Sequence, residues 1–93
     1  MDLTGFAEQI YNDLQLGEDK EFIEAIKNNT AETFAFDAHF GLGMFIRNQY
    51  GLWDEKSKWM HSLPDNIKVL HPDDISHQVL IEIHRYGQKK LEK

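Results

Sequence analysis

Two short segments contain the side chains that could carry out chemistry in this chain. The first includes Arg47, whose guanidinium is always charged and presents five N–H donors in a plane. The second includes two adjacent carboxylates, Asp73 and Asp74, followed by Ser76 and His77. If these groups converged, the serine, the imidazole and a carboxylate could support hydrolysis while the arginine held an anionic part of the substrate. The same residue types could equally form an internal ion pair.

The apolar neighbours of Arg47 in the sequence favour the internal ion pair. A buried guanidinium needs a carboxylate or several carbonyl oxygens as partners. We expect Asp73 or Asp74 to pair with Arg47 and to clamp the two segments together. In this hypothesis Asn48 hydrogen-bonds loop backbone and Trp53 covers the pair. The alternative is that Arg47 binds an anionic ligand, although two aspartates at the same place would repel it.

The five histidines could suggest a metal site, but their spacing does not support one. His77 and His84 would lie about 10.5 Å apart along a helix axis, which is too far for both to bind one ion. Asp73 and His77 are close enough on a helix to share an ion, but a further ligand, His39 or His71, would have to come from elsewhere. We therefore predict no metal site.

Catalytic and cofactor motifs are absent from the sequence. The serines lack a Gly-x-Ser-x-Gly context, and Gly41 and Gly43 do not form the Gly-x-Gly-x-x-Gly pattern that cradles phosphates. Asp73 and Asp74 are adjacent rather than placed to face each other across a cleft. We therefore predict no catalytic residues and no cofactor, and we expect a protein that is not an enzyme.

The length, charge and cysteine content exclude several classes of protein. The chain has 93 residues, enough for one domain, and no cysteine, so it has no disulfides and no thiolate zinc site. The net charge of −6 is unevenly placed, with −7 on residues 1–38 and +1 on residues 39–93, and the only basic cluster is at the C-terminus. We expect no direct nucleic-acid binding, because that requires a basic surface. No secretion signal or membrane span is recognisable, so we expect a cytoplasmic protein.

The spacing of apolar residues predicts an all-α fold, an irregular bundle of four to five helices in a single domain covering residues 1–93. Asp2 or Thr4, then Thr30 and Asp73, are expected to cap helices, and Gly17, Gly51 and Gly87 are expected to end them. The predicted helices cover residues 3–16, 18–28, 31–50, a short turn at 58–63 and a final helix from 73 to about 87, with a frayed basic tail from about 88. Residues 67–70 could be extended, but four residues do not establish a sheet.

Two glycines lie inside the third helical pattern, at Gly41 and Gly43. Each lowers helix stability by roughly 1 kcal/mol relative to alanine, so we expect a compensating contact. The preferred explanation is the close approach of another helix at a position without a side chain. A bend or a ligand contact is the alternative.

The two segments contain three motifs in a fixed order: Gly-Leu-Gly-Met-Phe-Ile-Arg47-Asn48, Gly51-Leu-Trp53 and His71-Pro-Asp73-Asp74-Ile-Ser76. Together these motifs resemble those of a family of small bacterial and phage domains catalogued as unknown in function. The resemblance covers roughly residues 34–87 and implies a compact, mainly helical unit without a known reaction. This chain departs from the family pattern after Trp53, where it has Ser57-Lys-Trp-Met-His in place of Ser-x-Leu-x-x-Phe.

The function that the sequence favours is a small non-enzymatic helical protein, an interaction or accessory module that binds an unknown protein partner. Its candidate interface is Trp59, Met60 and His61, because a short helix cannot bury every side chain. One alternative is a small ligand-binding or hydrolytic domain centred on the Arg47 cluster. A second is an inhibitor whose acidic first helices imitate nucleic acid.

Overall fold

The computed structural model describes residues 2–54 and 56–92, and all regular structure in these ranges is helical. The elements are α1 (Leu3–Asp13), the 3₁₀ helix η1 (Leu16–Glu18), α2 (Lys20–Asn28), α3 (Ala31–Ala38), the π-helical turn η2 (His39–Gly43), α4 (Met44–Gln49), α5 (Lys58–Ser62), α6 (Asp65–Lys68) and α7 (Pro72–Leu91). The predicted all-α class is therefore confirmed. The segment that could have been extended contributes to α6 instead. None of the helices in the described ranges is long and apolar enough to cross a bilayer.

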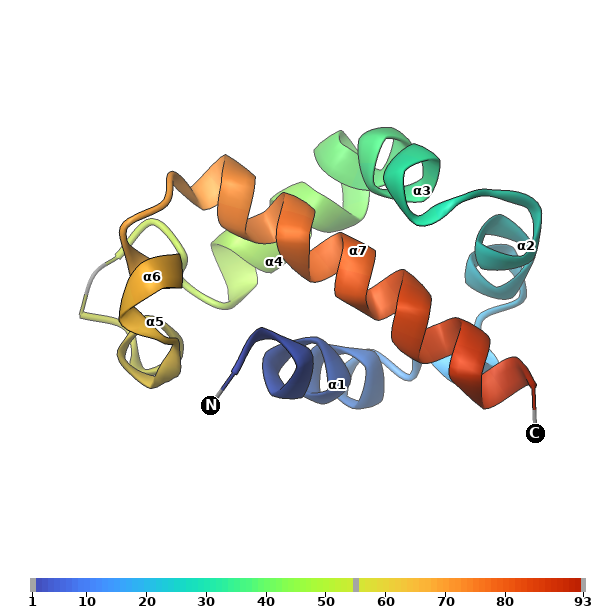
Figure 1. The fold of residues 1–93 in the computed structure, drawn as a ribbon, viewed down its shortest axis with the longest axis horizontal. Helices are drawn as coiled ribbons and strands as arrows, with labels where there is room; N and C mark the ends of the chain where they lie inside the picture. The colour runs from blue at the N-terminus through green and yellow to red at the C-terminus, as the bar shows by residue number, and fades with distance from the viewer. Residues whose placement is uncertain (1, 55, 93) are drawn as a thin grey trace.

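The long helix α7 is the central element of the fold. It runs across the molecule with α1 on one side and α3 and α4 on the other, as Figure 1 shows. Its inward residues recur at three- and four-residue steps, so one continuous stripe faces the other helices. The side chains that form the centre of the core and are fully buried include Phe6, Ile10, Ile26, Ile46, Ile75, Val79, Leu80 and Ile83. Burial of this stripe against two layers of helices is the main stabilising contribution.

The elements α3, η2 and α4 form one continuous helix with a wider turn in its middle. A Cβ atom at Gly43 would lie 3.3 Å from Leu80 Cδ1 and 3.2 Å from Arg47 Nη1, so this glycine allows the close approach of α7. The expected helix contact is therefore confirmed at Gly43. The same prediction is wrong at Gly41, where a Cβ atom would meet nothing within 4 Å.

The caps at the start of the chain are as expected, but the end of the first helix is not. Asp2 Oδ1 accepts from the Gly5 amide at 2.7 Å, and Asp2 is the N-cap of α1. The helix ends at Asp13, and the left-handed residue that follows is Gln15, with φ 53°, rather than Gly17. Gly17 instead contacts the side chain of Tyr11 closely, which explains why a small residue stands there.

Both predicted ends of the last helix are wrong. Its N-cap is His71, whose Nδ1 accepts from the Asp73 amide at 3.1 Å, because Pro72 already occupies the first helical position. At the other end α7 continues through Gly87 to Leu91, so residues 88–91 are helical rather than frayed. A Cβ atom at Gly87 would lie only 2.6 Å from Ile26 Cδ1, so this glycine makes room for α2.

Gly51 has φ +65° and ends α4 after Tyr50, as predicted. A Cβ atom at this position would also lie 2.9 Å from Ser57 Cβ. We expect Gly51→Ala to lower the free energy of unfolding by about 1–2 kcal/mol, from left-handed backbone strain and this contact. Gly41→Ala is the matched control, and it should be neutral or stabilise by up to about 1 kcal/mol. Urea unfolding measures both, and equal losses would contradict the different environments of the two glycines.

Candidate functional site

The guanidinium of Arg47 lies inside the protein, where α4 meets the start of α7. Arg47 is 3% exposed, and its Nε lies 3.3 Å from Asp73 Oδ1. Nη1 donates to Ser76 Oγ at 2.8 Å, and Nη2 donates to the His39 carbonyl at 3.3 Å. Each of the three nitrogens therefore has a partner within the chain, and the ion pair expected from the sequence is present with Asp73.

The hydroxyl of Ser76 is also fully used inside the protein. It accepts from Arg47 and donates its own proton to the Asp73 carbonyl at 3.0 Å. Ser76 is fully buried, Asp74 is exposed, and His77 is half-buried with no hydrogen bond to Ser76. The structure thus joins Arg47, Asp73 and Ser76, and it leaves Asp74 and His77 outside the cluster.

The two residues expected to complete the clamp take other positions. Asn48 follows Arg47 on the helix, so its side chain turns away from the core, and it is exposed rather than bonded to loop backbone. Trp53 is 56% exposed and packs edge-on against His71, with ring centroids 5.6 Å apart. The prediction that Trp53 covers the ion pair is therefore wrong, and Trp53 instead packs against the residue that caps α7.

The predicted interface on α5 is also wrong, because two of its three residues, Trp59 and Met60, pack against the core. Met60 is 5% exposed. Trp59 packs against Phe6 and Tyr50, at centroid distances of 5.5 and 5.3 Å. Of the three residues predicted to form the interface, only His61 is exposed. Helix α1, which covers Trp59 through Phe6, is distant from α5 in the sequence. The short length of α5 alone therefore could not predict this burial.

Four of the seven large apolar side chains that are exposed in the described residues lie together on the outer face of α3, η2 and α4. Phe36 and Phe40 are each 77% exposed, and Met44 and Phe45 are nearly half exposed. Exposed positions recur here in pairs every four residues. We call this set the α3–α4 stripe, and its members are Glu32, Thr33, Phe36, Asp37, Phe40, Gly41, Met44, Phe45, Asn48 and Gln49. Arg47 lies on the opposite, buried side of the same helix.

A surface pocket of about 490 Å³ opens on the α3–α4 stripe, lined by Phe36, Asp37, His39 and Phe40. The His39 and Phe40 rings meet edge to face at 4.9 Å. The Asp37 carboxylate is exposed and makes no ion pair or hydrogen bond with any residue that the structure describes. The pocket therefore combines aromatic surface with an unneutralised negative charge.

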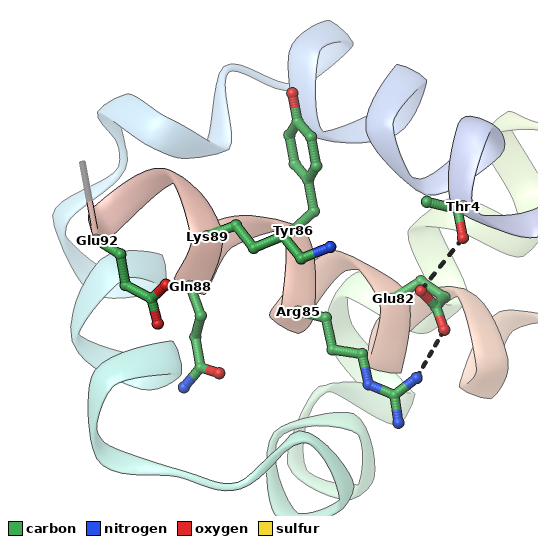
Figure 2. A pocket seen from close by; sticks show the side chains of 7 residues that line it. All are labelled: Thr4, Glu82, Arg85, Tyr86, Gln88, Lys89 and Glu92. Carbon is green, nitrogen blue, oxygen red and sulfur yellow. Dashed lines mark hydrogen bonds and ion pairs between the residues drawn. The ribbon is translucent and has the colours of Figure 1, made fainter.

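A second pocket lies beside the C-terminal part of α7 and is shown in Figure 2. Its charged groups neutralise each other, since Arg85 pairs with Glu82 at 2.9 Å and Thr4 donates to the other Glu82 oxygen at 3.4 Å. Five of its seven lining residues come from the single helix α7. The side chains that line this pocket do not converge on one kind of ligand. Within the described residues, no group of three His, Asp or Glu side chains could hold a metal ion.

A partly buried hydrogen bond joins α1 to the end of α4 and affects stability at high pH. Tyr50 Oη donates to Asp13 Oδ2 at 2.8 Å, and burial followed by this bond raises the pKa of Tyr50 above its usual value near 10. As the pH rises, the unfolded chain therefore loses the phenol proton of Tyr50 before the folded protein does. The contribution of the protonated phenol to the free energy of unfolding is fully present below pH 10 and is lost as the pH rises further.

We expect Tyr50→Phe to cost about 1 kcal/mol at pH 7 through the lost hydrogen bond, and to make stability fall less steeply above pH 10. Urea unfolding of the wild-type protein and the variant at pH 7, 9 and 11 measures both effects. Identical slopes above pH 10 would contradict the raised pKa.

The comparisons with known proteins identify one family. A family model described as "Domain of unknown function (DUF6794)" matches residues 6–86. No curated protein and no solved structure gives a significant match.

Proposed function

We propose that this chain, which belongs to the family described as a domain of unknown function (DUF6794), is a small non-enzymatic module that binds a protein partner through the α3–α4 stripe. The observation that carries the proposal is the 77% exposure of both Phe36 and Phe40, one helical turn apart. A large apolar side chain that stays in water does not contribute the favourable free energy of burial. Contiguous exposed apolar patches are therefore typical of interaction sites.

The contacts of Arg47 support a structural role for the polar cluster. Three of the five guanidinium N–H groups of Arg47 already have partners within the chain, and Arg47 is only 3% exposed, so a carboxylate or phosphate from outside has little access to the other two. Asp73 also places a negative charge where an anion would have to enter. The proposed role of Arg47 is to fix α4 against α7, so that the opposite side of the helix presents the stripe to a partner.

The same contacts argue against hydrolysis at Ser76. A nucleophilic serine needs a nearby base to take its proton, yet this hydroxyl donates to the Asp73 carbonyl and is fully buried. His77 makes no hydrogen bond to it. The ligand-binding or hydrolytic alternative therefore has less support than the interaction module.

Structural roles also account for part of the acidic first half, which weakens the inhibitor alternative. Asp19 accepts from two amides at the start of α2, and Asp13 accepts from Tyr50. Carboxylates fixed in caps and internal bonds are less available to imitate a row of phosphates.

We further propose that the motifs noted in the sequence are a signature of the family, among small bacterial and phage domains. In this chain they supply the Arg47 side chain, the left-handed Gly51 and the His71 cap. A chain without cysteine suits a reducing compartment, which supports a cytoplasmic location.

The test of the proposed function compares three baits in pull-downs from the native host. They are the wild-type protein, the double variant Phe36→Ser/Phe40→Ser, and the control Val69→Ser, which changes an apolar side chain that is 82% exposed elsewhere. We expect a protein captured by the wild type and the control to be lost from the double variant. With that protein purified, the double variant should bind at least about tenfold more weakly, as expected for aromatic hot spots.

The free energies of unfolding of the three baits should agree within about 0.5 kcal/mol, because the substituted side chains are exposed. A partner that binds the double variant as tightly as the wild type would overturn the proposed function.

A further inference from the structure

We propose that the partner presents a basic amphipathic helix that lies along the α3–α4 stripe. A lysine or arginine side chain of this helix would contact Phe36, Asp37 and Phe40 in the pocket that they line together with His39. This inference rests on the proposed function, because it names the class of partner that the same surface would bind. It is argued from charge, pocket chemistry, exposed area and the position of Gly41.

The charge of the stripe indicates a basic partner. Its only charged members are Glu32 and Asp37, both negative. Arg47 is the only Lys or Arg between residues 28 and 55, and it is buried and paired with Asp73. No cation from this stretch therefore neutralises the surface. The net charge of −6 on the whole chain adds long-range attraction for a basic segment.

The pocket has the groups that bind an alkylammonium or guanidinium side chain. The faces of aromatic rings attract cations within about 6 Å, and the aliphatic stem of lysine or arginine packs well on the same rings. Phe36 and Phe40 supply the rings, and Asp37 supplies a carboxylate without a partner in the described chain. A pocket of about 490 Å³ is large enough for one such side chain.

The elongated shape of the stripe and the small area of its two most exposed aromatic side chains favour a single helix over a whole globular protein. Aromatic side chains bury about 150–250 Å² each, so at 77% exposure Phe36 and Phe40 together present roughly 230–390 Å². A standard interface between globular proteins buries about 800 Å² on each partner. The stripe runs from residue 32 to residue 49, roughly 26 Å along the helix, which matches about five turns of a partner helix.

A second copy of the chain fits this surface less well. Each copy carries a net charge of −6, and the stripe offers no basic residue to the acidic residues of another stripe. Two such surfaces would meet without charge complementarity, and like charges brought together at an interface are unfavourable.

Gly41 supports docking of a helix at the middle of the stripe. A glycine in a helix costs roughly 1 kcal/mol relative to alanine, and nothing in the described chain lies within 4 Å of a Cβ atom placed there. Packing within the chain therefore does not explain the missing side chain. The space that it leaves beside Phe40 and Phe45 can accept a side chain or the backbone of the partner.

The test uses two synthetic helical peptides of eighteen residues with the same leucine positions. One carries lysine and arginine on its polar face, and the other carries glutamate. Titration followed by ¹⁵N amide NMR locates the contact, and calorimetry at low and physiological salt measures the affinity. We expect the basic peptide to shift the amides of residues 32–49 and the acidic peptide to leave them unchanged.

Three variants of the full chain sharpen the result. Asp37→Lys should weaken binding of the basic peptide at least tenfold, whereas Glu92→Lys, the same charge change on an exposed residue at the end of α7, should weaken it less than twofold. Gly41→Ala should weaken binding while leaving the fold at least as stable as the wild type. Circular dichroism on each variant separates loss of binding from loss of structure.

The failure of this inference is distinguishable from the failure of the proposed function. Equal affinity for the two peptides, an equal effect of Asp37→Lys and Glu92→Lys, or amide shifts confined to α1 and α2 would overturn the basic-helix partner. So would the absence of binding by either peptide. The interaction module would still stand in each case if the native partner were lost from Phe36→Ser/Phe40→Ser.

Discussion

Arg47→Ala is expected to lower the free energy of unfolding by about 3 kcal/mol, which is a large part of the stability of a domain of this size. The substitution removes a charge-assisted contact to Asp73 and hydrogen bonds to Ser76 and the His39 carbonyl. It also empties a position that is 97% buried from solvent, because Arg47 is only 3% exposed. Chemical denaturation followed by far-UV circular dichroism measures the loss.

Substitutions around Arg47 show which contact matters. Asp73→Asn should cost about 1 kcal/mol, less than loss of the arginine, because the Asp73 side chain is 47% exposed and water screens its charge. Asp74→Asn is the matched control on the neighbouring residue, which is exposed and outside the cluster, and it should change stability by less than about 0.5 kcal/mol. An Arg47→Ala protein as stable as the Asp74→Asn protein would contradict the structural role.

The second large effect is expected at His84, which joins α7 to the connection between α2 and α3. His84 is 2% exposed, and its Nε2 lies 2.7 Å from the Asn29 carbonyl, so the ring must donate a proton there. The ring also packs against Phe34 at 5.6 Å. His84→Ala removes the hydrogen bond and leaves a cavity, and it should lower the free energy of unfolding by about 2–4 kcal/mol.

His77→Ala is the control for this prediction, because His77 lies on the same helix but is only half-buried and makes no contact in the polar cluster. His77→Ala should lower the free energy of unfolding by less than about 1 kcal/mol. Thermal unfolding ranks the two variants directly. Similar Tm values for both would show that the buried contact to Asn29 contributes little.

The helices were predictable because local rules decide them. Apolar residues at helical spacing, together with Asp2 and Thr30 as caps, correctly gave the all-α class and the starts of α1 and α3. The cap of α7 was misassigned although the signal was present, since proline at the first helical position makes the preceding His71 the cap. Gly87 could not be interpreted locally, because its reason is the side chain of Ile26 on another helix.

The polar cluster was more predictable than the exposed surface. An arginine among apolar residues needs a carboxylate wherever it lies, so a contact with Asp73 or Asp74 followed from chemistry alone. Aromatic residues carry no such requirement and are assigned to the core by default. The available signal was their phase, because Phe36 and Phe40 fall two positions away from the buried Phe34 and the partly buried Ala38.

The burial of α5 was beyond the sequence for a different reason. A short helix with Trp59 and Met60 is amphipathic whether or not another element covers it. The covering element is α1, and the contact between Phe6 and Trp59 joins residues far apart in the chain. Only the tertiary arrangement distinguishes an uncovered patch from a packed one.

The most direct test is a double-mutant cycle between Arg47 and Asp73, with free energies of unfolding measured for the wild type, Arg47→Ala, Asp73→Asn and the double variant. If the two side chains hold α4 against α7, their coupling energy should be at least about 1 kcal/mol, so that the double variant is little less stable than Arg47→Ala. If the losses in the two single variants instead add up to the loss in the double variant within about 0.3 kcal/mol, Arg47 and Asp73 do not act as a clamp. That result would contradict the proposed role of Arg47 in holding the α3–α4 stripe outward.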